Sequence, residues 1–222
     1  MTRVLRVTPG ERFEISDNRQ VYLAEVASSE KDRVCFTVVE PVDVPAPVVR
    51  STLLASLTKF ERFEWAIEKA TELGVEQIVP IISERSEKGL EKAALKRLPR
   101  WQRIVREASE QSRRTRLPEL SAPVTLAAAL QMRVSYHFLL EEAEAPPILS
   151  MLPSACQPED GVALLVGPEG GWTDRERAAI AAAGWTAVSL GRNILRAETA
   201  AAAGLAIIHA AWAARARLTS PG

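Results

Sequence analysis

The sequence predicts an α/β protein: a small β-domain, followed by a larger domain in which helices cover both faces of a parallel β-sheet. Three observations predict this organisation. Residues 1–45 contain short runs of β-branched and aromatic residues between turn residues, which is typical of β-structure. Three prolines within residues 41–47 indicate a stiff linker. Beyond the linker, strand patterns alternate with helix patterns, as in a parallel sheet with crossover helices.

The first domain is predicted to end with the proline-rich stretch. Turns are expected at the Pro-Gly pair of residues 9–10 and the Asp-Asn pair of residues 17–18, because these residue types favour tight turns. We therefore divide the chain into a β-domain of residues 1–45 and a second domain of residues 46–222. The residues that suggest strands in the first domain are Val4, Phe13, Ile15, Val21, Tyr22, Val26, Val34, Phe36 and Val38.

The second domain is predicted to begin with a helix. Thr58 and Glu61 have the spacing of a capping box, and apolar residues then follow at helical intervals until Gly74. Residues 77–82 have the pattern of a strand, in which Pro80 indicates a sheet edge or a strand end.

The remaining elements continue the alternation. Pro99 is expected to interrupt the next helical segment, before an apolar stripe within residues 101–108. Thr173 and Glu176 have the spacing of a second capping box, which opens a helix that closes at Gly184. Further strands are predicted at residues 134–140, 162–166 and 185–190, and an alanine-rich final helix at residues 198–215.

Composition excludes several classes of function. No run of about 18 apolar residues is present, and the first residues lack the apolar core of a signal peptide. We therefore expect a cytoplasmic protein with no membrane-spanning segment. Cys35 and Cys156 are far apart and are expected to be reduced and buried. A metal site is not expected, because neither of the two histidines lies near a cysteine.

Charge is unevenly distributed in this neutral chain. Residues 84–116 contain eleven basic and five acidic residues, a net charge of +6. Such a segment can attract phosphate groups. A solvated helix face with internal ion pairs explains the same pattern and is favoured when the segment is taken alone.

The first candidate motif is GPEGGW at residues 167–172. Its glycines allow the backbone to approach a ligand closely, and Pro168 stiffens the loop. The motif is neither the GxGxxG of dinucleotide-binding folds nor a P-loop. A tight turn needs fewer glycines than this, so we favour a ligand-binding loop.

The second candidate motif is LGRNILRAETA at residues 190–200. Ile194 and Leu195 lie in a predicted loop, where apolar side chains can form the wall of a site for a flat ring such as adenine. Inward packing of Leu195, with Glu198 as a favourable charge at a helix N-terminus, explains the pattern equally well. Both loops follow strands of the predicted sheet, and ligands bind beyond the carboxyl ends of such strands.

Four blocks together resemble the RsmE family of the SPOUT superfamily of RNA methyltransferases. Besides the two motifs above, EKATELGVEQIVPIISERS at residues 68–86 and RWQRIVREASEQSRRTRLP at residues 100–118 resemble family blocks in the same order. The resemblance extends over residues 59–209. It departs from the family at Asn193 and Ala197, where arginine and threonine are more frequent, and the missing arginine is expected to weaken an RNA contact.

The resemblance implies a trefoil-knotted α/β domain preceded by a PUA-like β-barrel that binds RNA, here expected to be shortened at its start. It also implies a homodimer that uses S-adenosylmethionine, without a metal, to methylate N3 of a uridine in the 16S rRNA of the small ribosomal subunit. The uridine is expected to leave its base stack.

The resemblance assigns roles to individual residues. We expect Arg85, Arg114, Arg196 and Glu198 to act in catalysis, and Glu169 to serve either as a base or as a brace for its loop. Trp172 is expected to contact ligand. The residues expected to be structural are His137, His209, Trp101, Trp185 and Trp212. The predicted cofactor-binding residues are Leu139, Val166, Gly167, Pro168, Glu169, Gly170, Gly171, Leu190, Gly191, Asn193, Ile194, Leu195, Arg196, Thr199 and Ala200.

Two alternatives are kept. One is a SPOUT methyltransferase that acts on another RNA, and the other is a non-catalytic RNA-binding factor for ribosome assembly. Binding of S-adenosylmethionine distinguishes the second alternative from an enzyme.

Overall fold

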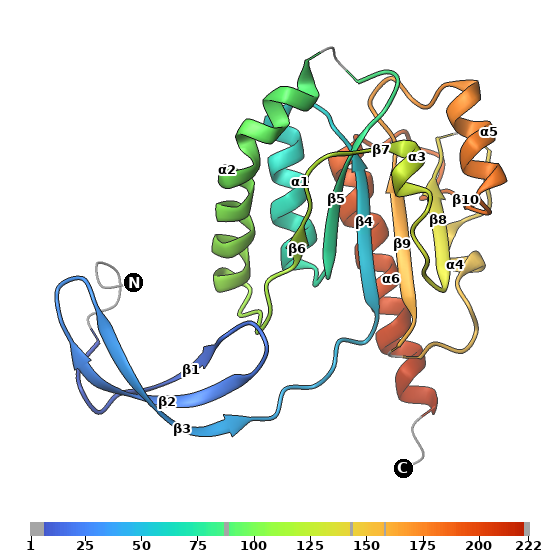
Figure 1. Ribbon diagram of the computed structural model, residues 1–222. Helices are drawn as coiled ribbons and strands as arrows, with labels where there is room; N and C mark the ends of the chain where they lie inside the picture. Colours follow the sequence, from blue (N-terminus) through green and yellow to red (C-terminus); the bar gives the residue numbers. More distant parts are fainter. Residues whose placement is uncertain (1–6, 87–88, 143, 158, 220–222) are drawn as a thin grey trace. The chain divides into compact units, whose positions relative to one another are not determined.

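The computed structural model describes residues 7–86, 89–142, 144–157 and 159–219, and for residues 216–219 it describes the backbone only. The chain divides into two compact units, Met1–Ala46 and Pro47–Gly222. Figure 1 shows the elements of both units. The predicted strand residue Val4 and two charged residues of the basic segment, Glu87 and Lys88, lie outside the described residues.

The first unit contains a three-stranded antiparallel sheet. Its strands β1 (Arg12–Ser16), β2 (Val21–Ser29) and β3 (Val34–Val42) lie in the order β1-β2-β3. The predicted turn between β1 and β2 is present. There the Asp17 carboxylate accepts hydrogen bonds from the amides of Arg19 and Gln20, both at 2.8 Å. Pro41, expected in the linker, belongs instead to the edge strand β3, the kind of strand in which proline is tolerated.

The second unit contains a seven-stranded sheet in the order β10-β8-β9-β4-β5-β6, with β7 also pairing with β5. Every pairing in this sheet is parallel, as predicted. The strands are β4 (Arg50–Ser56), β5 (Gln77–Ile82), β6 (Glu119–Leu120), β7 (Val124–Thr125), β8 (Tyr136–Leu140), β9 (Gly161–Val166) and β10 (Thr186–Val188).

Helices cover both faces of this sheet (Figure 1). Successive strand residues point to opposite faces, so Leu53 and Leu164 belong to one apolar cluster, whereas Leu54 and Leu165 belong to another. The first cluster includes residues of α1 (Phe60–Glu72), α2 (Leu90–Gln111), α4 (Ile148–Met151) and α6 (Ala197–Thr219). The second includes residues of α3 (Leu126–Ala129) and α5 (Asp174–Ala182). The predicted fold class, an α/β sheet covered on both faces, is confirmed.

Two helix predictions are wrong. Helix α1 has Lys59 at its N-cap without a side-chain hydrogen bond, so Thr58 and Glu61 form no capping box. Helix α2 continues through Pro99 without a break. Pro99 lies on the exposed side of α2, while Ala94 and Trp101 anchor the helix on either side of it in the core. Buried contacts therefore outweigh the hydrogen bond that proline cannot make.

Pro80 lies inside the sheet rather than at its edge. On one side β5 pairs with β4, and on the other it pairs first with β6 and then with β7. The neighbouring segment of the chain stops pairing with β5 after Leu120 and pairs with it again at Val124. Pro80 therefore faces the gap between β6 and β7. A residue without an N–H can occupy this position because no hydrogen bond is required of it.

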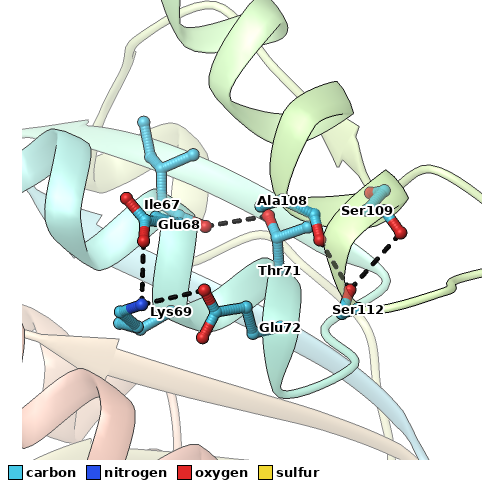
Figure 2. Close-up of polar contacts among 8 residues, drawn as sticks. All are labelled: Ile67, Glu68, Lys69, Thr71, Glu72, Ala108, Ser109 and Ser112. Carbon is cyan, nitrogen blue, oxygen red and sulfur yellow. Dashed lines mark hydrogen bonds and ion pairs between the residues drawn. The ribbon is translucent and has the colours of Figure 1, made fainter. Parts of the chain in front are cut away.

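Polar contacts hold α1 and α2 together and close their ends. Glu64 on α1 accepts hydrogen bonds of 2.9 Å from Arg97 and Arg100 on α2, so the acid neutralises part of the basic segment. Figure 2 shows the C-terminal parts of both helices, where Lys69 lies between Glu68 and Glu72. In the same view, the hydroxyl groups of Thr71 and Ser112 donate to backbone carbonyl oxygens of their own helices.

Helix α6 packs against the sheet. Over Ala197–Arg215 it is, among the described residues, the one helix long and apolar enough to cross a membrane by length and composition, a test that core helices also pass. Its residues Leu205, Ile208 and Trp212 are buried in the first apolar cluster. A side chain at Gly204 would lie 2.8 Å from Leu164 on β9, so glycine there permits the close approach of helix and sheet.

Candidate functional site

A cavity of about 310 Å³ lies at the carboxyl ends of β8, β9 and β10. This is the end of a parallel sheet at which ligands bind, and the volume suits a small molecule. Both glycine-bearing loops contribute to it, as predicted. Its lining residues are Arg62, Leu140, Glu141, Glu142, Val166, Gly167, Pro168, Glu169, Gly171, Trp172, Arg177, Leu190, Gly191, Asn193, Ile194, Leu195, Arg196, Ala197 and Ala200.

The loop of residues 167–171 requires glycine at two positions. A Cβ atom at Gly167 would lie 2.8 Å from Nε1 of Trp172, which is buried below the loop. Gly171 has a φ of 68°, and its amide donates a 2.8 Å hydrogen bond to the carbonyl oxygen of Pro168. The loop is therefore a compact turn whose backbone forms a wall of the cavity.

Hydrogen bonds at the N-terminus of α5 link the glycine loop to the residues that follow β5. The predicted capping box of Thr173 and Glu176 is confirmed. Glu176 also accepts a 2.8 Å hydrogen bond from the amide of Glu84, and Thr173 donates one of 3.0 Å to the Glu84 carboxylate. Next to Glu84, Arg85 donates a 2.5 Å hydrogen bond to the carbonyl oxygen of Gly170. The basic segment thus begins in contact with the glycine loop.

The loop of residues 190–196 forms the facing wall. Gly191 has a φ of 122°, which favours glycine. Ile194 is 78% exposed although it is a large apolar residue, and it borders the cavity together with Leu190 and Leu195. An exposed isoleucine at a cavity suits contact with a flat apolar surface of a ligand.

Charged side chains occupy two sides of the cavity. Arg177 on α5 pairs with Glu141, directly after β8. Arg62 on α1 pairs with Glu169 of the glycine loop, and its Nε lies 4.0 Å from Oε1 of Glu198 on α6. The second carboxylate oxygen of Glu198, Oε2, is buried and accepts no hydrogen bond from the described residues.

The predicted cofactor residues gather at this cavity with three exceptions. Leu139 is buried on the sheet face covered by α3 and α5. Gly170 faces Arg85, and Thr199 is exposed on α6 outside the lining. Trp172, expected to contact ligand, borders the cavity from its buried position.

The four predicted catalytic residues are not all in one place. Arg196 lines the cavity, and Arg85 and Glu198 contact or adjoin its loops. Arg114 lies elsewhere: it donates a 2.8 Å hydrogen bond to the carbonyl oxygen of Thr71, near the C-terminal end of α1. Since α1 begins at the cavity, that end is about 14 Å further along the helix axis. Within one chain Arg114 does not border the cavity.

Several lining residues were missed by sequence reasoning. Glu141 and Glu142 follow a predicted strand directly, so the rule that ligands bind at carboxyl ends of strands could have indicated them. Arg62 and Arg177 lie on helices and carry no local signal. The missed residues are Arg62, Leu140, Glu141, Glu142, Arg177 and Ala197.

The remaining polar candidates are structural. Nε2 of His209 lies 2.7 Å from the Ser51 hydroxyl, and burial, with a smaller contribution from the Arg114 cation, lowers the pKa of His209 to about 4. His137 contacts the carbonyl oxygen of Met132 at 3.0 Å.

The other predictions concern cysteines, tryptophans and metal ions. Cys156 is buried as expected, but Cys35 is exposed on β3, contrary to expectation. Trp101, Trp185 and Trp212 are buried. Within the described ranges no cluster of three metal-ligating side chains occurs.

Family models match both parts of the chain. Residues 44–209 match the RNA methyltransferase domain, and residues 1–39 match the RNA methyltransferase PUA domain. The chain is 36% identical to ribosomal RNA small subunit methyltransferase E of Synechocystis, covering 95% of this chain and 69% of that protein. It is 34% identical to the protein of the same name from Aquifex aeolicus, covering 89% and 85% respectively.

A solved structure agrees with the fold. The structure is that of ribosomal RNA small subunit methyltransferase E from Neisseria gonorrhoeae, bound to S-adenosyl methionine. It superposes with a TM-score of 0.83 at 34% identity, covering 95% of this chain and 87% of that one. The resemblance seen in the four sequence blocks is confirmed by these matches.

Proposed function

Since the chain belongs to the ribosomal RNA small subunit methyltransferase E (RsmE) family of RNA methyltransferases, we propose that it transfers the methyl group of S-adenosylmethionine to N3 of a uridine in 16S rRNA. The observation that carries the proposal is the cavity that residues 167–171 and 190–196 form together. The Neisseria relative, which is bound to S-adenosyl methionine, shares this fold.

The cavity residues fit such a cofactor. Gly167 and Gly171 permit the compact turn whose backbone lines the cavity, and Ile194 and Leu195 offer apolar surface to an adenine ring. The buried Oε2 of Glu198 can accept a hydrogen bond that the described residues do not supply. When bound, S-adenosylmethionine supplies an electrophilic methyl group, and the protein orients the group and excludes water from it.

The protein's own side chains would prepare the uracil. N3 is a weakly acidic imide nitrogen, so its proton must be removed before or during attack. The carboxylates of Glu169 and Glu198 lie near the cavity and are the candidate bases. Arg85 and Arg196 are exposed beside it and can stabilise the developing negative charge on a uracil oxygen. Arg114 is not included, because within one chain it lies near the C-terminal end of α1 and does not line the cavity.

RNA would approach over the basic residues. Helix α2 presents the exposed side chains of Lys92, Lys96, Arg103 and Arg106, which can contact phosphates. We assign RNA docking to the N-terminal unit, which matches the PUA domain model, and methyl transfer to the second unit. The homodimer, the trefoil knot and the cytoplasmic location stay predictions from the family resemblance.

Calorimetry with S-adenosylmethionine, followed by methylation of small ribosomal subunits that lack the modification, tests the proposal. Arg85→Ala is expected to lower turnover by about tenfold or more, since one lost charge-stabilising donor typically costs at least that much. Arg175→Ala is the control, because Arg175 pairs with Glu84 nearby without contacting the glycine loop. Failure to bind the cofactor would favour a non-catalytic assembly factor. Methylation of a different RNA would favour a SPOUT methyltransferase with another substrate.

A further inference from the structure

We propose that Arg62 is a positioning residue of the cofactor site, which joins the glycine loop to the start of α6 through Glu169 and Glu198. The inference rests on the proposed function, because it concerns how that site keeps its shape. Arg62 lies in neither of the two loop motifs and reaches the site from α1.

The course of the chain places Arg62 at the cavity. Strand β4 ends at Ser56, and α1 starts with Phe60 at the same end of the sheet. Arg62 is in the first turn of α1, and its side chain, 32% exposed, lines the cavity. A residue further along the helix would lie further from this end of the sheet.

Two nitrogen atoms of the guanidinium group face two different segments. Nη1 donates to Oε1 of Glu169 in the glycine loop, and Nε lies 4.0 Å from Oε1 of Glu198 at the start of α6. The planar guanidinium holds these nitrogens in a fixed relation. It therefore anchors Glu169 by a hydrogen bond and draws Glu198 towards it by a longer ion pair.

The charges explain why a cation is needed there. The Glu198 side chain is only 11% exposed, whereas that of Glu169 is 42% exposed. Without Arg62 the two carboxylates would repel each other, and Glu198 would be a buried charge without a partner cation. Either the loops would move apart or Glu198 would take up a proton, and both changes alter the cavity wall.

Isothermal titration with S-adenosylmethionine tests this role in the full chain. Arg62→Met is expected to weaken the affinity for the cofactor about tenfold. The free energy of a partly exposed hydrogen bond between charged groups corresponds to a factor of about ten in an equilibrium constant. Arg62→Lys is expected to recover part of the loss, because lysine restores the charge without the planar geometry. Lys69→Met is the matched control. Lys69 also lies between two carboxylates on α1 (Figure 2), but it does not line the cavity.

The pH dependence of binding separates positioning from general stability. In Arg62→Met, affinity is expected to depend on pH, because protonation of one carboxylate would relieve the repulsion between Glu169 and Glu198. The double variant Arg62→Met with Glu198→Gln is expected to lose this pH dependence, because glutamine does not titrate. A measurement of thermal unfolding alone would not detect a pH-dependent change in cofactor affinity.

Each outcome decides between clear alternatives. Wild-type affinity in Arg62→Met, or an equal loss in Lys69→Met, would overturn the positioning role while leaving the proposed function intact. If Arg62→Met does not fold, Arg62→Lys and Glu198→Gln give the same comparison, and unchanged affinity in both overturns the role. No binding by the wild-type chain would overturn the proposed function itself.

Discussion

Substituting Gly167 tests whether the glycine loop is held rigidly by the side chain below it. A Cβ atom at this position would lie 2.8 Å from Nε1 and 3.2 Å from Cε2 of Trp172. Trp172 is only 3% exposed and packs in the second apolar cluster, so its indole ring cannot turn away. Gly167 is not among the glycines with positive φ, so alanine would suit the backbone and the effect of Gly167→Ala would be steric.

The magnitude follows from two opposing terms. Overpacking in a closed interior costs about 1–3 kcal/mol. Replacing glycine by alanine restricts the unfolded chain and returns about 0.4–1 kcal/mol. The difference between the two terms has a central value of about 1.3 kcal/mol, which lowers Tm by about 3–5 °C for a chain of this size.

Gly170→Ala is the matched control in the same loop. The nearest atom to its Cβ would be Cδ of Arg85 at 3.6 Å, an ordinary van der Waals distance. Its effect on the free energy of unfolding is expected to stay within about 0.5 kcal/mol. Thermal unfolding of both variants without cofactor provides the comparison. Equal Tm values for Gly167→Ala and wild type would refute the steric argument, as would equal losses in both variants.

Three further variants test the supporting contacts. Because the pKa of His209 is about 4 in the fold, only the unfolded chain gains this proton between pH 6.5 and 4. The free energy of unfolding should therefore fall by about 2–3 kcal/mol as pH drops through that range, and His209→Asn should flatten the slope in urea titrations. Glu64→Gln should cost about 1–2 kcal/mol at pH 7 by weakening the hydrogen bonds from Arg97 and Arg100, and an unchanged urea midpoint would contradict this. Thr173→Ala should cost about 1 kcal/mol through the lost cap of α5, and hydrogen exchange of the first α5 amides should become faster. The control is Thr125→Ala, which removes the corresponding cap of α3 and should leave the α5 amides unchanged.

The sequence predicts those parts of the fold in which local pattern and final environment agree. Strands β8 and β9 and the capping box at Thr173 were predicted because period and caps are local signals. Strand β4 was missed although it lies in the middle of the sheet. Its residues Ser51–Ser56 are buried on both faces, so no alternation of polar and apolar residues marks it as a strand.

The candidate site shows the same division. Its two loops carry motifs, and their meeting follows from the rule for carboxyl ends of parallel strands. The partners of those loops could not be predicted in this way. Arg62 and Glu169 are 107 residues apart, and a helix surface offers no signal that one of its arginines faces a distant loop. Arg114 is the opposite case. Its sequence block resembles the family and therefore suggested a catalytic role, but its guanidinium donates a hydrogen bond to a backbone carbonyl near the end of α1.

The gap beside Pro80 has a consequence for solubility. An exposed sheet margin is a template on which a strand of another molecule can assemble, and long, regular margins are the most prone to aggregation. Here the margin next to β5 consists of β6 and β7, two residues each, separated by residues 121–123 (Figure 1). A foreign strand would find no continuous row of backbone donors and acceptors there. The proline that interrupts pairing inside the sheet thus accompanies a margin that resists intermolecular strand addition.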